Sequence, residues 1–242
     1  MESANYTRKF FVNRHDADFM GYLKPGTLLR YAQQVATDQC TALGFDPAFY
    51  EAHHCAFLLA KQGLIFHRVP RIDETLTVIT MPEKARRAIS RRITMVEDAS
   101  GALVAEVHSW WVLVDLNTRH IMRHCLEEVD QHWNDKVEAT MEFRMPKAAE
   151  LTEGPIVTAN YQNCDLNQHL NNCEYADMAC ATVPIEEMRQ KPITKLLVTY
   201  HREIPLGGTM QLQSGPVDGG WYTCGTRLAD GLPAFEAYCC AE

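Results

Sequence analysis

The sequence carries the stretch LIFHRVPRI at Leu64–Ile72 and the related stretch VTYHREIPL at Val198–Leu206. In both, an aromatic residue precedes His-Arg, and a proline follows shortly afterwards. A strand-like segment comes next in each case, Thr75–Val78 and Thr209–Leu212. The two copies lie much farther apart than the repeats of a solenoid, so we expect two copies of one folding unit.

A helical pattern precedes each of these stretches. The segments Asp18–Leu23 and Asp165–Leu170 hold corresponding places, and a helix is expected after each. Pro25 stands near the start of the first helix, where a missing N–H costs nothing, and Gly44 can end that helix in a left-handed conformation. The apolar stripe of this helix is Leu28, Ala32, Val35, Cys40 and Leu43. The second stripe runs until Pro184 and consists of Tyr175, Met178, Ala179 and Thr182.

Four strand-like runs follow each helix, separated by turns rich in Gly, Asp and Pro. In the first copy they are Ala56–Phe66, Thr75–Met81, Ile89–Glu97 and Val104–Asp115. In the second copy they are Lys195–Arg202, Thr209–Ser214, Trp221–Arg227 and Ala234–Cys239. This order predicts an α+β double hotdog, in which each of two tandem repeats is an antiparallel sheet wrapped around a long helix. We expect the N-terminal repeat at residues 1–134, a linker at 135–154 and the C-terminal repeat at 155–242.

Composition and charge exclude several classes of protein. Acidic residues outnumber basic ones by 31 to 23, whereas a general nucleic-acid binder needs a basic surface to neutralise phosphates. No apolar run approaches the roughly 20 residues needed to span a bilayer. The polar N-terminus has no secretory signal, so a cytoplasmic protein without a membrane span is expected.

The cysteines and histidines predict neither a metal site nor a cofactor. The nine cysteines are scattered and form no Cys-x-x-Cys pair, so reduced thiols are expected rather than disulfides or a zinc site. His120 and His124 are four residues apart, but their surroundings are typical of a hairpin rather than of a helical ligand pair.

A dense polar segment, Cys164–Asn172, leads into the second helix. It alternates a carboxylate, an amide and an imidazole at Asp165, Asn167 and His169. The Asn171 and Asn172 that follow are good helix-capping residues. Backbone N–H groups and the dipole at a helix start favour developing negative charge, so this segment can hold a polarised carbonyl group. Taken singly, the same residues are also common in turns, caps and structural roles.

Comparison of the two copies limits the polar set to one of them. The first copy has Met20 and Tyr22 where the second has Asn167 and His169. It likewise has Val69 in the place of Glu203, while Asp18 persists opposite Asp165. We therefore expect one active site per chain, in the second half. His67 and His201 occur in both copies, as do Arg68 and Arg202, and these four are interpreted as structural.

The chain resembles the acyl-acyl carrier protein (acyl-ACP) thioesterases, which are best known from plant plastids and also occur in bacteria. The resemblance covers nearly the whole chain. Its strongest elements are Asp165–Asn172 followed by Tyr175, and Tyr200–Glu203. A third element is Trp111–Arg119 with the later Glu127–Val129. Three such matches in the same order form a specific signal.

The resemblance implies hydrolysis of fatty acyl-ACP to a free fatty acid and holo-ACP, which terminates fatty acid synthesis. It assigns catalysis to Asp165, Asn167, His169 and Glu203. One position departs from the plant pattern, because Ile204 stands where plant members have a cysteine. No plastid transit peptide precedes the matched region, which fits a bacterial cytoplasmic enzyme.

Thioester hydrolysis needs a positioned water, a base and donors for the oxyanion. Glu203 and His169 are both candidate bases, and Asn167 can orient the water or donate to the carbonyl. Helix-start amides near Asn171 can form the oxyanion site. Asp165 either orients its neighbours or attacks the carbonyl directly, and the sequence leaves both roles open.

The remaining expectations concern the substrate and its carrier. The first half is expected to shape the acyl pocket with Met20, Leu28 and Leu29, and Asn171 and Asn172 are expected to contact the substrate. A basic cluster is either a solvated strand face or a docking surface for acidic ACP: Lys84, Arg86, Arg87, Arg91 and Arg92. Two other functions remain open besides the hydrolysis of acyl-ACP. The chain could be an acyl-CoA thioesterase of the same fold or a non-catalytic acyl-thioester-binding protein. The chain is expected to be a monomer or a homodimer.

Overall fold

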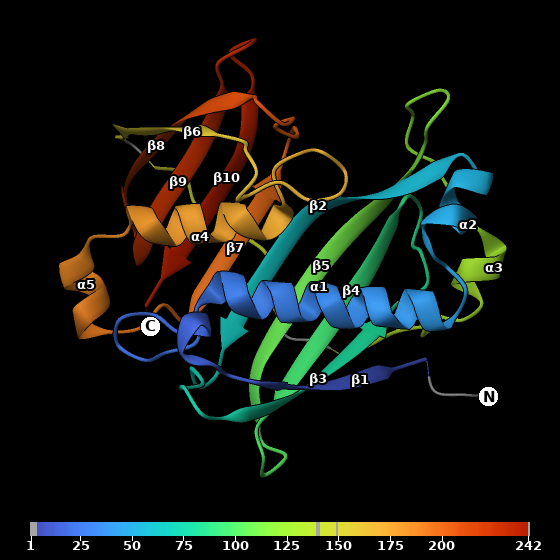
Figure 1. Cartoon of the computed structure of the whole chain (residues 1–242), viewed down its shortest axis with the longest axis horizontal. Helices are drawn as coiled ribbons and strands as arrows, with labels where there is room; N and C mark the ends of the chain where they lie inside the picture. The colour runs from blue at the N-terminus through green and yellow to red at the C-terminus, as the bar shows by residue number, and fades with distance from the viewer. Residues whose placement is uncertain (1–3, 139–140, 149, 242) are drawn as a thin grey trace.

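The computed structural model describes residues 4–138, 141–148 and 150–241. Its ten strands form one antiparallel sheet in the order β1-β3-β4-β5-β2-β7-β10-β9-β8-β6 (Figure 1). The first five in chain order are β1 (Tyr6–Phe11), β2 (Cys55–Phe66), β3 (Thr75–Pro82), β4 (Ile89–Glu97) and β5 (Leu103–Asp115). The others are β6 (Thr152–Thr158), β7 (Lys195–Tyr200), β8 (Thr209–Val217), β9 (Gly220–Arg227) and β10 (Pro233–Cys240).

The strand order is symmetric about its centre. Reading outward from the β2–β7 junction, β5, β4, β3 and β1 on one side correspond to β10, β9, β8 and β6 on the other. Each half carries one long helix, α1 (Pro25–Ala42) or α4 (Asn172–Thr182), lying across its part of the sheet (Figure 1). The predicted double hotdog is therefore confirmed, and the two halves share a continuous sheet through β2 and β7.

Three further helices are short. They are α2 (Pro47–Ala52), α3 (Glu127–Asp130) and α5 (Ile185–Gln190), and a 3₁₀ turn spans Arg14–Asp16. Across the described residues, the helices lack the length and apolar character that a membrane span requires.

Helix α1 begins and ends as its residues predict. Pro25 occupies the first turn, and Gly44 lies just beyond the end with a φ of 81°. Leu28, Ala32 and Val35 are buried against the sheet. This apolar face anchors the helix and fixes which of its side chains remain on the opposite, open side.

The two long helices contact each other. The Arg30 guanidinium on α1 binds the carboxylates of Glu174 and Asp177 on α4, at 2.5 and 2.7 Å. Gly26 makes the close approach possible, because a Cβ at that position would collide with the Asp177 carboxylate. The start of α4 is thereby held beside the middle of α1.

The segment expected as the linker contains the start of a strand. Strand β6 begins at Thr152, inside the segment assigned to the linker, and pairs with β8 at the sheet edge. Before it, Met141 packs with Leu197 and Tyr238 on the sheet face away from the helices. Phe143 makes an edge contact with the Trp110 ring, with centroids 5.3 Å apart. Residues 139, 140 and 149 of the expected linker lie outside the described residues.

Candidate active site

Asp165 organises the loop that joins β6 to α4. Its Oδ1 accepts the Asn167 backbone N–H at 2.9 Å, and its own N–H donates to the His169 carbonyl at 3.1 Å. Gln168 completes the turn with a φ of 61°, a left-handed conformation that non-glycine residues rarely adopt. The loop thus presents Asn167 and His169 from one tight turn.

His169 lies between two carboxylates. Its Nδ1 is 3.9 Å from Asp165 Oδ1, and its Nε2 is 3.9 Å from Glu203 Oε2. The His169 side chain is 20% exposed, whereas that of Glu203 is 65% exposed. A histidine in this position can exchange a proton with Glu203 at its solvent-facing side.

Backbone hydrogen bonds place Glu203 beside His169. The Leu170 N–H donates to the Ile204 carbonyl at 2.9 Å, and the Leu206 N–H donates to the Gln168 carbonyl at 2.8 Å. The loop from Cys164 to Asn171 is therefore attached to the segment after β7, although Glu203 is distant in sequence. Asp165, His169 and Glu203 lie together and Asn167 joins them through its backbone N–H, while the catalytic roles of all four stay predictions.

Asn171 and Asn172 form the start of α4. Asn171 is the N-cap, and its Oδ1 accepts the Cys173 N–H at 2.9 Å. Its Nδ2 donates to Asp165 Oδ2 at 3.1 Å, so the cap and the loop support each other. Asn172 is the first helical residue, and an amide there has no acceptor within its own helix.

A groove opens between the halves at this point. The second half contributes Asp165, Asn171 and Cys164, and helix α1 contributes Arg30 and Gln33. The first half therefore forms one wall of the candidate site. Sequence comparison of the copies missed this contribution, because Gln33 belongs to a helix with no catalytic motif.

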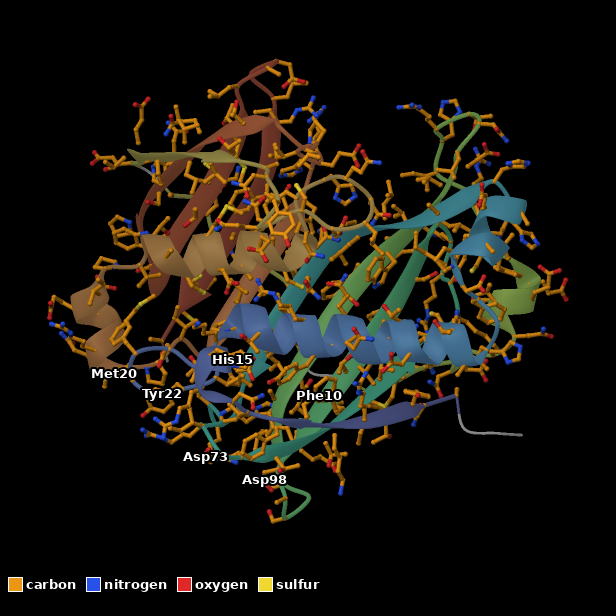
Figure 2. All side chains as sticks on the ribbon, in the orientation of Figure 1. Phe10, His15, Met20, Tyr22, Asp73 and Asp98 are labelled. Atoms are coloured by element: carbon orange, nitrogen blue, oxygen red, sulfur yellow. The ribbon has the colours of Figure 1, made fainter. Side chains whose placement is uncertain are left out.

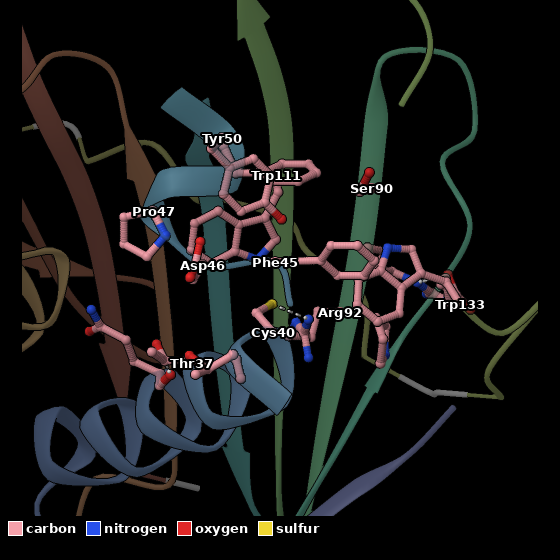
Figure 3. A pocket seen from close by; sticks show the side chains of 17 residues that line it. Thr37, Cys40, Phe45, Asp46, Pro47, Tyr50, Ser90, Arg92, Trp111 and Trp133 are labelled. Carbon is pink, nitrogen blue, oxygen red and sulfur yellow. Dashed lines mark hydrogen bonds and ion pairs between the residues drawn. The ribbon is translucent and has the colours of Figure 1, made fainter. Parts of the chain in front are cut away.

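A separate apolar cavity of about 300 Å³ lies in the first half. Helix α1, helix α2 and the inner face of β4 and β5 surround it (Figure 3). Its aromatic walls are Phe45, Tyr50, Phe57, Trp111 and Trp133. A narrower space lies beside it, because Gln33, Ala36, Arg92 and Trp111 line both the cavity and that space, and Gln33 also lines the groove.

The three residues expected to line an acyl pocket, Met20, Leu28 and Leu29, do not line this cavity. Leu28 and Leu29 are fully buried in the main core, on the sheet-facing side of α1. Met20 is exposed on the turn before α1, at the end of that helix remote from α2 (Figure 2). None of the three lines the cavity beside α2, because α1 turns its apolar stripe toward the core and a different face toward the cavity.

The basic cluster does not form a single exposed face. Arg91 pairs with the buried Glu83 at 2.7 Å, and Lys84 pairs with Asp135 at 2.6 Å. Arg92 points the other way, into the cavity wall, where it donates to Gln39 Oε1 at 2.5 Å and to Thr80 Oγ1 at 2.9 Å. Strand alternation explains this division, since neighbouring residues of β4 face opposite sides of the sheet.

Arg92 was missed as a cavity residue. Its guanidinium lies over the Trp133 ring, 5.5 Å from the centroid, and beside the Cys40 thiol (Figure 3). Burial lowers the pKa of Arg92 below its usual value. Arg92, Thr94 and Val96 are alternate residues of β4, so their side chains lie on the same face of the strand. That alternation with Val96 was the signal in the sequence that places the Arg92 side chain on the interior face.

The cysteines near the site are protonated. Burial raises the pKa of the Cys173 thiol to about 12 and also raises the pKa of Cys164. Thiolate, not thiol, is the nucleophile, so neither side chain is activated. Among the described residues, no group of three or more His, Cys, Asp or Glu side chains is arranged to hold a metal ion.

Known protein families match both halves of the chain. A model of the acyl-ACP thioesterase N-terminal domain matches residues 3–132, and a model of the C-terminal domain matches residues 149–225. A chloroplastic palmitoyl-acyl carrier protein thioesterase of Cuphea hookeriana is 24% identical over 193 residues, 73% of this chain and 46% of its own length. A chloroplastic oleoyl-acyl carrier protein thioesterase 2 of Arabidopsis thaliana is 20% identical over 219 residues, 82% of this chain and 59% of its own length.

Solved structures show the same fold along the whole chain. An acyl-ACP thioesterase from Bacteroides thetaiotaomicron superposes with a TM-score of 0.87 at 22% identity, covering 99% of this chain and 98% of that one. A 12:0-ACP thioesterase from Umbellularia californica gives a TM-score of 0.84 at 16% identity, covering 100% and 98%. The chain spans about half the length of the curated relatives it matches. With both domain models matched in order over most of its residues, the chain belongs to the acyl-ACP thioesterase family.

Proposed function

We propose that the chain hydrolyses the thioester of a fatty acyl group carried on acyl carrier protein. The observation that carries the proposal is the position of His169 between Asp165 and Glu203, beside the start of α4. Asp165 also lines a groove, and Gln33 lines both that groove and an apolar cavity of about 300 Å³. A base, a helix start and an apolar cavity in this order suit an acyl thioester.

The helix start receives the thioester carbonyl. As the tetrahedral intermediate forms, negative charge develops on the carbonyl oxygen, and the Asn172 amide with the dipole of α4 stabilises it. The acyl chain extends away from the groove, past Gln33, into the cavity of the first half. The carrier thiol points toward the open side of the groove.

Water attacks the carbonyl carbon in this mechanism. Glu203, which is exposed, and His169 together remove one proton from the water, and Asn167 orients it. When the intermediate collapses, the C–S bond breaks and the proton passes to the departing thiolate. The products are a free carboxylic acid and the carrier thiol.

Both oxygens of Asp165 are already engaged. Oδ1 accepts from the Asn167 backbone and Oδ2 accepts from Asn171 Nδ2. A carboxylate held by two donors is a poorer nucleophile than a free one, so we assign Asp165 an orienting role. This choice between the two roles rests on the hydrogen bonds of the loop.

Thiol release from acyl-ACP and acyl-CoA substrates of graded chain length tests the proposal. We expect release from acyl-ACP and a strong loss of release in His169→Ala. Preferential release from acyl-CoA would instead identify an acyl-CoA thioesterase. Binding of every thioester without release would contradict hydrolysis and identify an acyl-binding protein.

A further inference from the structure

Arg92 brings a positive charge to the wall of the apolar cavity, and no carboxylate of the described residues pairs with it. Two acidic residues line the same cavity, but Glu83 is bound to Arg91 and the exposed Asp46 caps the start of α2. A charge enclosed by protein is costly unless an opposite charge accompanies it. The counter-charge that Arg92 lacks is therefore one that a ligand can supply.

Arg91, the neighbour of Arg92 on β4, shows how a guanidinium of this strand holds a carboxylate. Its Nε donates to one oxygen of Glu83 and its Nη2 donates to the other, both at 2.7 Å. Two parallel hydrogen bonds from one edge of a guanidinium are the geometry that arginine uses to recognise carboxylates. The same edge of Arg92, formed by Nε and Nη2, is the one to examine.

The Nε–Nη2 edge of Arg92 is largely unused. The bonds of its guanidinium are made by Nη1, which donates to Gln39 Oε1 at 2.5 Å and to Thr80 Oγ1 at 2.9 Å. Nη2 has only a long contact with the Cys40 sulfur, 3.7 Å away. Among the described residues, the Nε–H has no acceptor. The edge that binds a carboxylate in Arg91 is thus available in Arg92.

This free edge has access to open space. Among the described residues, the buried side-chain nitrogen and oxygen atoms without a partner belong to His108 and Trp221, and none belongs to Arg92. Arg92 is half-buried, and the spaces that it lines are the cavity and the narrow space beside it. The Trp133 ring lies against the face of the guanidinium, which leaves the edges free for hydrogen bonds (Figure 3).

The other walls of the cavity suit a hydrocarbon chain. They are aromatic on several sides, and the volume of about 300 Å³ is at the lower end of the range of small-molecule sites. Burial of an aliphatic chain between these walls is favourable. A plain hydrocarbon, however, offers neither an acceptor nor a negative charge to Arg92. The cavity therefore fits a chain that ends in an anionic acceptor.

We propose that the apolar cavity is a binding site for an aliphatic carboxylate, which pairs with the Nε–Nη2 edge of Arg92 while its chain packs against the aromatic walls. Such a carboxylate has two sources. It is a free fatty acid, or it is the far end of an acyl group that is bound for hydrolysis. The site goes beyond the proposed function, and only the second source rests on it.

The first test measures binding to the unaltered protein. Octanoate and octanol have the same chain length, but only octanoate carries a negative charge. Calorimetry gives both affinities, and the fluorescence of Trp111 and Trp133 reports binding in the cavity that they line. We expect the Kd of octanoate to be lower than that of octanol by about tenfold or more. Equal affinities, or no binding of octanoate, would overturn the inference.

The second test removes the charge. Arg92→Met keeps an apolar side chain in the wall, so the Kd of octanoate should rise to that of octanol, while octanol binding changes little. Arg87→Met is the matched control, because Arg87 is exposed on the turn before β4 and does not line the cavity. It should leave both affinities unchanged. A preference for octanoate that persists in folded Arg92→Met would overturn the inference.

A variant that keeps Arg92 makes the test independent of the folding of Arg92→Met. Ala36 lines the cavity, and Ala36→Leu fills part of it without touching the charge of Arg92. Displacing about two methylene groups of the bound chain should weaken octanoate binding by about tenfold. Octanoate affinity that is unchanged in Ala36→Leu would place the carboxylate outside the cavity and overturn the inference.

Kinetics separate the two sources of the carboxylate. Octanoyl-ACP is compared with an acyl-ACP of the same length whose far end carries a carboxylate, and free octanoate is added in a third series. A higher kcat/KM for the carboxylate form that is lost in Arg92→Met assigns the site to the substrate. Inhibition by octanoate that is relieved in Arg92→Met assigns it to free fatty acid. Octanoate binding that depends on Arg92, without hydrolysis of either acyl-ACP, would contradict the proposed function and leave the carboxylate site standing.

Discussion

Asp18 and Asp165 make the same turn in the two halves of the chain. Asp18 Oδ1 accepts the Met20 N–H at 2.8 Å, as Asp165 Oδ1 accepts the Asn167 N–H at 2.9 Å. The backbone of Asp18 also accepts from Gly21, where the second half uses Gln168. The carboxylate therefore has a structural function that is independent of catalysis, and only the second copy adds an imidazole beside it.

Asp18→Ala isolates this structural function. We expect it to lower the free energy of unfolding by about 1–3 kcal/mol, because two turn amides lose their acceptor, and to leave kcat near the wild-type value. Asp165→Ala should lower both stability and kcat. Urea denaturation and thiol-release assays on the two variants measure this. Loss of catalysis in Asp18→Ala would show that the first half takes part in the chemistry.

Isotope labelling separates the two roles considered for Asp165. In a single turnover in oxygen-18 water, direct water attack places the label in the released acid. Attack by the Asp165 carboxylate would form an anhydride first, and water attack on the Asp165 carbonyl of that anhydride would place the label in the protein instead. We expect the label in the acid. Detection of a labelled Asp165 peptide by mass spectrometry would contradict this.

The imidazole and carboxylate of the site should be essential. His169→Ala, Asn167→Ala and Glu203→Ala are each expected to lower kcat by about 10² or more, as when a general base or an oriented donor is lost. Tyr22→Phe is the matched control for His169, since Tyr22 occupies the corresponding place in the first half. Circular dichroism checks that each variant folds. Near wild-type turnover in all three alanine variants would refute the assignment.

No cysteine should act as the nucleophile. Burial raises the pKa of Cys173 to about 12, and Ile204 occupies the position where the plant pattern has a cysteine. Cys164→Ser and Cys173→Ala should therefore retain hydrolysis, and alkylating reagents at neutral pH should spare it in the folded protein. An acyl group trapped on either thiol and identified by mass spectrometry would overturn this expectation.

The repeat made most of the fold predictable. Strand β4 was expected at Ile89–Glu97 and lies there, and β2 begins one residue before its expected start at Ala56. Alternating side chains between turn residues report strands reliably when one face is buried. A short strand was expected before each long helix, but the bounds of β6 could not be predicted, because it is an exposed edge strand with little burial to impose a pattern.

The candidate site was predictable only in part. The spacing of Asp165, Asn167 and His169 places them on one turn, whereas Glu203 reaches them through backbone pairing that spacing alone does not reveal. The cavity was not predictable, because its walls depend on how α1 is rotated about its axis. Leu29 faces the core and Ala36 faces the cavity, although both belong to the same helix.

The Glu83–Arg91 pair should make stability depend on pH. Burial by itself raises the pKa of Glu83, but hydrogen bonds from Arg91 and from the Val137 N–H outweigh it, so the pKa is lowered overall. A carboxyl whose pKa is lowered by folding stabilises the protein above its unfolded pKa of about 4.3, and this contribution is lost as the pH falls through the folded value.

Glu83→Gln tests that dependence. At pH 7 we expect it to lower the free energy of unfolding by about 3 kcal/mol, because Arg91 loses its partner beside a buried site. The difference from the wild type should shrink as the pH falls below about 4.3 and vanish below the lowered folded pKa of Glu83, where the group is protonated in both states. Urea denaturation across this range measures it. A difference that stays constant with pH would show that charge pairing is not the cause.

The acyl cavity should set the chain-length profile through residues beside α2. Ala36 lines both the cavity and the narrow space beside it, so Ala36→Leu fills space that the acyl chain would occupy. Burial of one methylene group stabilises the bound chain by about 0.8 kcal/mol, and the variant leaves room for fewer of them, so we expect the preferred chain to become shorter. Leu29→Ala is the control, because Leu29 is buried in the core away from the cavity. This variant should lower the free energy of unfolding by about 2–5 kcal/mol and leave the chain-length profile unchanged. Analysis of the products formed from acyl-ACP of graded chain length tests this prediction. A chain-length profile that changes in Leu29→Ala but not in Ala36→Leu would contradict it and would indicate that the acyl pocket lies along the apolar face of α1.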